Sequence, residues 1–122
     1  MNDYIPSITA DVNLDEGNLV FKLVVFTGNL DKAGLDSVRT KVEEVVDSIE
    51  SEKFVVFDFD KLEFINSESI GFLLMLHTRL VKKGAKLVVV RAIDRVKDVL
   101  DVIGLLKIMD YFPTIEEFKK SL

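Results

Sequence analysis

Apolar runs typical of β-strands alternate with segments of helical period along this chain. Leu19 to Phe26 and Phe54 to Phe59 are apolar and rich in Val and Phe, and Lys86 to Arg91 follows the same pattern. Between these runs, apolar residues recur at helical spacing from Lys32 to Ile49 and from about Ser67 to Lys83. Strands that alternate with helices need crossover connections, so the order predicts an α/β fold with parallel inner strands.

The two ends of the chain complete the expected architecture. Ile8 to Val12 alternates weakly and is separated from the next strand by turn-forming residues, which predicts an N-terminal hairpin. A short helix is expected to end at Gly104, followed by a brief strand around Lys107 to Met109 and a closing helix from Thr114. The predicted fold class is an α/β sandwich: a mixed β-sheet with an N-terminal hairpin, parallel inner strands and about four helices.

Composition limits both the size and the chemistry of the protein. The 122 residues, 48% hydrophobic and 30% charged, predict a single domain over residues 1–122 with a core from about residue 8 to residue 118. The net charge of -5, with scattered Lys and Arg, argues against a direct nucleic-acid partner. The absence of cysteine excludes thiol catalysis and thiolate metal sites. No signal peptide or membrane-spanning run is found, so we expect a cytoplasmic protein without a membrane partner.

Asp58 and Asp60 follow an apolar strand and look like a catalytic pair. They resemble the first motif of haloacid-dehalogenase-type phosphatases, but Lys61 and Leu62 replace its Gly and Thr, and the later residues cannot supply the groups that hold Mg²⁺ and phosphate. A receiver domain of two-component signalling is disfavoured because Phe26 to Asn29 lacks its acidic pair. The favoured interpretation is a strand end and a turn, with Asp60 helping the chain to leave the sheet. We therefore expect no enzyme activity, no metal and no cofactor.

A polar cluster stands where the strand gives way to the next helix, and it has two interpretations. Asn66, Ser67 or Ser69 can each cap the helix, and Glu68 suits the positive end of the helix dipole. The same position exposes a hydroxyl beside free N–H groups that would tolerate a phosphate. A phosphate adds about -1.5 to -2 charges, enough to break a fitted protein interface. The residues alone leave both interpretations open.

The stretch around this cluster resembles the STAS domain of anti-sigma factor antagonists. That family typically shows Leu-x-Phe-h-Asp-Ser-x-Gly-h-(Gly), where h is hydrophobic, and this chain has "LEFINSESIG" at Leu62 to Gly71. Asn66 stands in place of the Asp, and Ser69 in place of the first Gly. Further matching positions are Gly28 to Asp31, Gly84 and Gly104-Leu105. The resemblance covers roughly Ile8 to Phe118.

The resemblance implies a non-enzymatic switch between protein partners. In the family, the serine that matches Ser67 is phosphorylated by a partner that is both a serine kinase and an anti-sigma factor. The unphosphorylated antagonist binds that partner and frees the sigma factor, the phosphorylated form cannot bind, and a phosphatase resets the switch. For this chain the resemblance implies phosphorylation of Ser67 and partner contacts at Asn66, Ser67, Glu68, Ser69, Phe72, Met75, Asn29 and Asp31.

The same helix contains three more residues with predictions of their own: Phe72, Met75 and His77. Phe72 and Met75 point away from the apolar stripe of the helix, so either neighbouring elements cover them or they form an exposed apolar patch beside Ser67. His77, the only histidine, lies on the apolar stripe and is expected to be partly buried with its hydrogen bonds satisfied, rather than a metal ligand.

The competing function for the whole protein is a STAS-like scaffold or small-ligand-binding module that is never phosphorylated.

Overall fold

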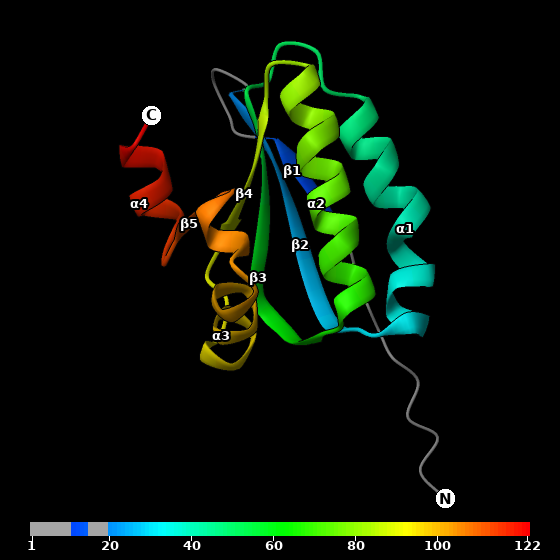
Figure 1. Cartoon of the computed structure of the whole chain (residues 1–122). Coiled ribbons are helices and arrows are strands. Elements are labelled where there is room, and N and C mark those ends of the chain that lie inside the picture. The colour runs from blue at the N-terminus through cyan, green and yellow to red at the C-terminus, as the bar shows by residue number, and fades with distance from the viewer. Residues whose placement is uncertain (1–10, 15–19) are drawn as a thin grey trace, which may run out of the picture.

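The computed structural model describes residues 11–14 and 20–122, and its strands form one sheet in the order β1-β2-β3-β4-β5 (Figure 1). The elements are β1 (Asp11–Leu14), β2 (Phe21–Leu30), α1 (Lys32–Asp47), β3 (Phe54–Ile65), α2 (Ser67–Lys82), β4 (Lys86–Val90), α3 (Asp94–Ile103), a 3₁₀ turn (Leu105–Lys107), β5 (Asp110–Phe112) and α4 (Ile115–Lys120). Strands β2 to β5 run parallel to one another. The predicted α/β fold with parallel inner strands and four helices is therefore confirmed for the described residues.

The first strand, β1, lies antiparallel to β2 at one edge of the sheet. Asp11 pairs with Val25, and Leu14 pairs with Lys22. The direction of this pairing agrees with the expected N-terminal hairpin. The turn between the two strands, predicted at Asp15 to Asn18, lies outside the described residues, so the hairpin itself stays a prediction.

The strand β3 is twice as long as the sequence predicted. It runs from Phe54 to Ile65, whereas the apolar run indicated an end near Phe59. Asp58 and Asp60 both lie inside the strand. The interpretation of these aspartates as a strand end and a turn is therefore wrong.

Two irregularities in the pairing of β3 with β2 explain this error. The register shifts between Val25 and Thr27 and again between Gly28 and Asn29. Beyond the first shift the neighbours Asp60 and Lys61 are both exposed, so the alternation of inward and outward residues that marks a strand is lost. Gly28 has φ 101°, a backbone conformation that favours glycine, which explains its position at the second shift.

The brief strand expected around Lys107 to Met109 exists, but it lies three residues later in the chain, as β5. Gly104 ends α3 with φ 87°, the chain then makes the 3₁₀ turn, and β5 begins only at Asp110. Leu105 and Met109 are buried while Lys107, two residues from each, is exposed, which is the pattern of a helical turn and not of a strand.

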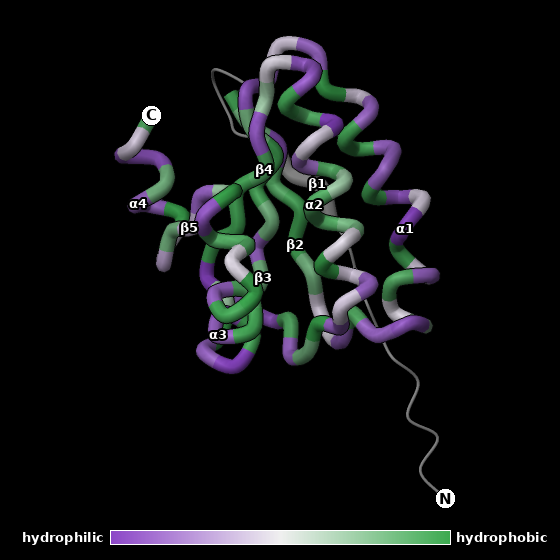
Figure 2. Tube along the Cα trace, in the orientation of Figure 1, coloured by the Kyte–Doolittle hydropathy of each residue, from purple (hydrophilic) through white to green (hydrophobic). Residues whose placement is uncertain are grey.

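Different helices cover the two faces of the sheet. Helices α1 and α2 lie side by side on one face (Figure 1), and buried residues of α3 join the same core. On the other face, Phe118 of α4 packs against the rings of Phe21, Phe54 and Phe112, with ring centroids 5.1, 5.3 and 5.6 Å away. The inner strands are accordingly hydrophobic, whereas hydrophilic residues recur along α1 (Figure 2). No helix in the described part of the chain has the length and apolarity needed to cross a membrane.

Candidate functional site at the start of helix α2

Helices α1 and α2 begin close together, just beyond the ends of the paired strands β2 and β3 (Figure 1). Leu30 and Ile65, the last residues of these strands, are paired in register. The carbonyl of Leu30 accepts a hydrogen bond from the backbone N–H of Asn66 at 3.0 Å. The positive ends of two helix dipoles therefore lie beside the carboxyl-terminal ends of β2 and β3.

Each of these helices has a side-chain cap at its N-terminus. The Oδ1 atom of Asn66 accepts a hydrogen bond from the N–H of Ser69 at 2.8 Å, and Oδ1 of Asp31 accepts one from the N–H of Gly34 at 2.8 Å. Of the three cap candidates in the sequence, Asn66 is thus the residue that caps α2. The backbone of Asn66 is extended, as is usual for a residue in this position.

Ser69, one of the predicted contact residues, lies in the interior. Its side chain is fully buried, and its hydroxyl donates a hydrogen bond to the carbonyl of Leu30 at 3.0 Å. Arg91 is the only non-glycine residue with positive φ in the described ranges, so Ser69 takes an ordinary helical conformation. The serine that replaces the family's glycine therefore strains nothing and ties α2 to the end of β2.

Ser67 is exposed and is the first residue of α2. Its side chain makes no hydrogen bond to any other residue that the structure describes. Because Ile70 is the first residue to donate within the helix, the N–H groups of Ser67 and Glu68 have no partner inside it. The hydroxyl of Ser67 thus stands free beside unsatisfied donors at the positive end of a helix dipole.

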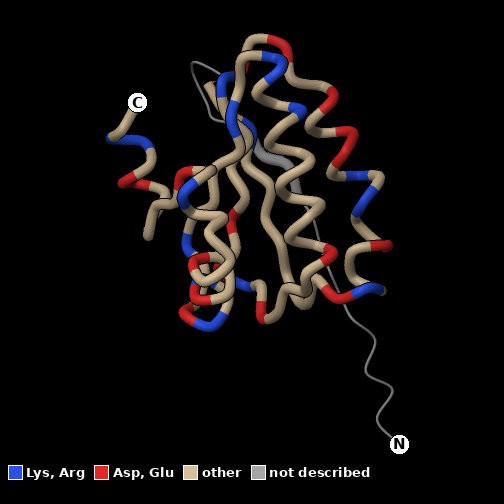
Figure 3. Tube along the Cα trace, viewed as in Figure 1, with Lys and Arg blue, Asp and Glu red and all other residues tan. Residues whose placement is uncertain are grey.

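An arginine of α1 lies against the same turn of α2. A terminal nitrogen of the Arg39 guanidinium is 3.6 Å from the carboxylate of Glu68, and the guanidinium lies 5.0 Å from the centre of the Phe72 ring. Further along the two helices, Arg79 of α2 pairs with Glu43 of α1 at 3.7 Å. Figure 3 shows charged residues along α1 and near both ends of α2. The ion pairs bridge the two helices where both face solvent.

Phe72 and Met75, the two apolar candidates on α2, differ in their exposure to solvent. Phe72 is only 5% exposed, because α1 and Arg39 cover it, whereas Met75 is 38% exposed. Of the two alternatives that the sequence left open, coverage by a neighbouring element holds for Phe72, and exposure beside the helix start holds for Met75. Two exposed side chains that sequence analysis missed, Phe64 and Leu74, flank the same helix start and its second turn. Both are apolar, so the sequence pattern alone gives no indication that they are exposed.

The remaining predicted contact residues, Asn29 and Asp31, lie at the carboxyl-terminal end of β2. Asn29 is half-buried in β2 and is paired in register with Phe64. Asp31, also half-buried, is held in its capping position at the start of α1. The structure thus brings the two segments of the prediction, residues 29–31 and 66–69, together across the paired strand ends.

Asp58 is held by a partner that sequence analysis missed. The Nε and Nη2 atoms of Arg91 lie 3.1 and 2.7 Å from the two carboxylate oxygens of Asp58, which is 2% exposed. A second carboxylate, that of Asp60, lies 4.0 Å from Arg91. Hydrogen bonding to Asp58 raises the pKa of Arg91 above its ordinary value. A carboxylate that is buried and fully paired in this way is not available as a nucleophile.

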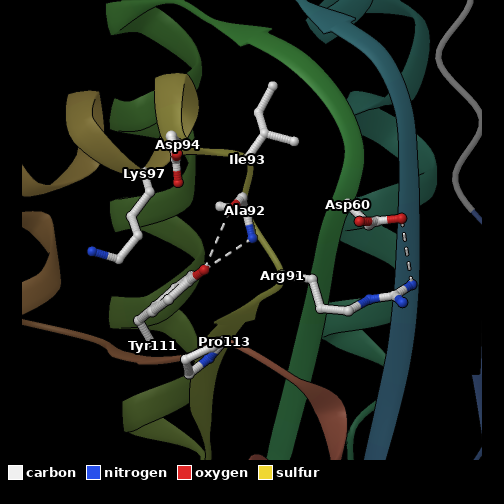
Figure 4. Close-up of a pocket in the computed structure, with 8 residues that line it drawn as sticks. All are labelled: Asp60, Arg91, Ala92, Ile93, Asp94, Lys97, Tyr111 and Pro113. Carbon is white, nitrogen blue, oxygen red and sulfur yellow. Dashed lines mark hydrogen bonds and ion pairs between the residues drawn. The ribbon is translucent and has the colours of Figure 1, made fainter.

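A cavity of about 370 Å³ adjoins this ion pair (Figure 4). It is lined by Asp60, Arg91, Ala92, Ile93, Asp94, Lys97, Tyr111 and Pro113. The hydroxyl of Tyr111 accepts a hydrogen bond from the N–H of Ala92 at 3.1 Å, and Lys97 lies 5.5 Å above the Tyr111 ring. Among the residues 11–14 and 20–122, no group of three His, Cys, Asp or Glu side chains is arranged to hold a metal ion.

The single histidine is buried, as the sequence predicted. His77 is 8% exposed, and its Nδ1 atom accepts a hydrogen bond from the N–H of Leu87 at 3.3 Å. Burial lowers the pKa of His77 below its ordinary value, and the charge of Lys86 acts in the same direction. His77 therefore joins α2 to β4 as a neutral side chain, and its hydrogen bond is satisfied.

These features define an α/β domain that presents an exposed serine at a helix N-terminus, beside a second helix start. A family model for the STAS domain matches residues 10–118. The chain therefore belongs to the STAS domain family.

Solved structures of the same fold have more than one function. An anti-sigma factor antagonist from Mycobacterium paratuberculosis is similar with a TM-score of 0.81 and 22% identity, covering 94% of this chain and 93% of that one. The anti-sigma factor antagonist SpoIIAA of Bacillus, in its unphosphorylated form, is similar with a TM-score of 0.70 and 19% identity, covering 91% and 95%. The murine anion transporter Slc26a9 is similar with a TM-score of 0.70 and 15% identity, covering 92% of this chain and 21% of the transporter. At these identities the similarity shows the fold, and function has to be argued from the site.

Proposed function

We propose that this STAS domain is an anti-sigma factor antagonist that switches partners through Ser67. In its unphosphorylated form it binds an anti-sigma factor that is also a serine kinase, and so frees a sigma factor. Phosphorylation of Ser67 releases the partner, and a phosphatase restores the first state. The domain itself catalyses no reaction, because the kinase and the phosphatase supply the chemistry.

The exposure of Ser67 is the observation that carries this proposal. Of the polar residues in the cluster, Asn66 is engaged as the helix cap and Ser69 is buried, with its hydroxyl bonded to the backbone. Ser67 alone among these three has its side chain exposed and without a hydrogen bond to the described residues. A kinase can reach its Oγ atom without unfolding the helix, accept its proton and transfer a phosphoryl group to it from a nucleoside triphosphate.

The electrostatics at the start of α2 support a switch that leaves the fold intact. The free N–H groups of Ser67 and Glu68 and the helix dipole favour an anion at this position. Glu68 repels a phosphate on Ser67, but Arg39 lies close to Glu68 and partly neutralises it. The phosphorylated protein therefore stays folded. A partner surface fitted to the neutral hydroxyl loses its fit, because about two negative charges are now buried against it.

The proposed contact surface leaves out two of the residues expected from the sequence and adds two exposed ones, Phe64 and Leu74. Ser69 and Phe72 are buried and are left out of it. The surface consists of Asn29, Asp31, Phe64, Asn66, Ser67, Glu68, Leu74 and Met75. It combines a polar centre at the two helix starts with three exposed apolar side chains, which is the composition of a transient protein interface.

Phosphorylation by the serine kinases of the anti-sigma class in the source organism tests the proposal. Each purified kinase is incubated with ATP and the wild-type protein, Ser67→Ala or the control Ser69→Ala, and the products are mapped by mass spectrometry. We expect phosphate on Ser67 of the wild type and of Ser69→Ala, and none on Ser67→Ala. Phosphate at another residue, or unchanged labelling of Ser67→Ala, would overturn the proposal.

Binding measurements separate the switch from its alternative. Calorimetry with the same kinase and ADP is expected to show tight binding of the wild type and of Ser67→Ala. Ser67→Asp is expected to bind at least about tenfold more weakly, because a single charge in a fitted interface costs on the order of 1–3 kcal/mol. Equal binding of all three proteins would instead favour a scaffold or small-ligand-binding module that is never phosphorylated.

A further inference from the structure

The fold does not require glycine at position 71 of α2. It is exposed, it lies in the second turn of the helix, and its φ is not positive. A Cβ atom built on Gly71 meets nothing within 4 Å. Glycine inside a helix is less favourable than alanine, because it loses more backbone freedom on folding. The glycine therefore weakens the helix without relieving any contact or strain in this domain.

The neighbours of Gly71 on the helix surface are the exposed residues of the proposed site. At 100° per residue, Gly71 lies about 40° around the helix from Ser67 and one turn along it. Leu74 and Met75, 39% and 38% exposed, lie three and four residues further on, one on each side of this line. Ser67, Gly71, Leu74 and Met75 thus form one continuous solvent-facing strip, polar at its start and apolar at its end.

We infer that Gly71 is a specificity-determining contact for the serine kinase of the anti-sigma class, whose uncharged, apolar segment packs directly on the helix backbone at this position. The inference rests on the proposed function. An enzyme that phosphorylates Ser67 must bring its phosphoryl donor to about 3–3.5 Å from Oγ, and must therefore approach this strip of α2 closely. With no side chain at Gly71, the partner reaches the helix backbone between Leu74 and Met75, and these two side chains flank the inserted segment.

The test compares Gly71→Ala with a matched variant on another helix. Ser37, exposed on α1, lies 200° around that helix from Arg39, on the side turned away from α2. Ser37→Leu therefore adds bulk to an exposed helix position outside the strip. Three quantities are measured for the wild type and both variants: melting temperature, affinity for the purified kinase with ADP, and the rate of Ser67 phosphorylation with ATP.

We expect Gly71→Ala to melt about 3 °C higher than the wild type, because alanine is the better helix former. Its affinity for the kinase and its phosphorylation rate are expected to fall at least about tenfold, as for an overpacked interface. Ser37→Leu is expected to bind and react as the wild type does. This opposition between stability and binding is what a purely structural glycine would not produce.

Two results would overturn the inference while leaving the proposed function intact. One is a Gly71→Ala protein that binds the kinase and is phosphorylated like the wild type. The other is a Gly71→Ala protein that melts below the wild type, because the glycine would then serve the fold. A wild-type protein that no such kinase binds or phosphorylates would instead sink the proposed function, and the inference about Gly71 with it.

Discussion

Arg91, which directly follows β4, closes a bidentate ion pair on Asp58 inside the neighbouring strand β3. The two residues are 33 positions apart in the chain, and their paired atoms are 3.1 and 2.7 Å apart. Asp58 is 2% exposed, whereas Arg91 keeps 40% of its side chain in contact with solvent. The arginine also has φ 59°, which is uncommon for a residue with a Cβ atom. The pair therefore explains how the carboxylate of Asp58 is buried.

Removing Arg91 is expected to destabilise the fold strongly. Arg91→Ala leaves the buried carboxylate of Asp58 without its partner, and we expect the free energy of unfolding to fall by about 3 kcal/mol. Alanine keeps a Cβ atom, so the backbone strain at this position is the same in both proteins. Urea unfolding measures the difference.

The neighbouring aspartate provides the control for that measurement. Asp60 is half-exposed and lies 4.0 Å from Arg91, so Asp60→Asn is expected to cost less than about 0.5 kcal/mol. Equal losses for Arg91→Ala and Asp60→Asn would contradict the assignment of the buried pair to Asp58.

Substitution of the capping residue Asn66 by Asp is expected to preserve stability, whereas substitution by Ala is expected to lower it. Asn66→Ala removes the acceptor for the N–H of Ser69 and is expected to lower stability by about 1 kcal/mol. Asn66→Asp restores the family's usual residue, caps equally well and places a negative charge at the positive end of the helix dipole, so its stability stays within about 0.5 kcal/mol of the wild type or rises. Thermal unfolding of the three proteins decides, and a loss in Asn66→Asp as large as that in Asn66→Ala would refute the capping role.

The two serines of the cluster are expected to respond in opposite ways. Ser69→Ala removes a buried hydrogen bond to the carbonyl of Leu30, and we expect about 1 kcal/mol lower stability. That carbonyl still accepts a bond from Asn66, which limits the loss. Ser67→Ala changes an exposed side chain and is expected to stay within about 0.5 kcal/mol of the wild type. Denaturant titrations that gave the larger loss for Ser67→Ala would speak against this arrangement.

His77 is expected to make stability depend on pH below neutrality. In the folded protein, burial and the charge of Lys86 lower the pKa of His77 below its ordinary value of 6.5, while Asp110 opposes this shift. The unfolded chain therefore binds a proton at a higher pH than the folded one. Stability contributed by the neutral ring is complete above pH 6.5 and falls as the pH drops from there toward the lowered pKa.

A non-titrating residue at the same position isolates this contribution. Between pH 7.5 and 5.5 the wild type is expected to lose more unfolding free energy than His77→Gln, measured by urea titration at each pH. Protonation of Nδ1 also breaks the bond from Leu87, which acts in the same direction. Parallel pH profiles for the two proteins would rule out His77 as the source.

Local signals in the sequence predicted most of the elements and the position of the site. Helix starts at Lys32 and Ser67 follow from side-chain caps and from apolar residues at helical spacing, which act within a few residues of each other. The same reasoning failed at Asp60, because the pairing of β3 with β2 shifts register there and destroys the alternation on which a strand assignment depends. It was inexact again at Lys107, where a 3₁₀ turn precedes the short strand, which begins only at Asp110.

The sequence by itself determined the order of strands and helices and the place where a polar cluster with a serine meets a helix start, because these depend on neighbours in the chain. Only the tertiary structure decided which serine is available. Ser69 turns inward because the carbonyl of Leu30, 39 residues earlier, lies within reach, and Ser67 is left outside. The same holds for Phe72, covered by Arg39 of α1, and for Asp58, paired with Arg91. Such contacts join segments far apart in the chain, so no local pattern encodes them.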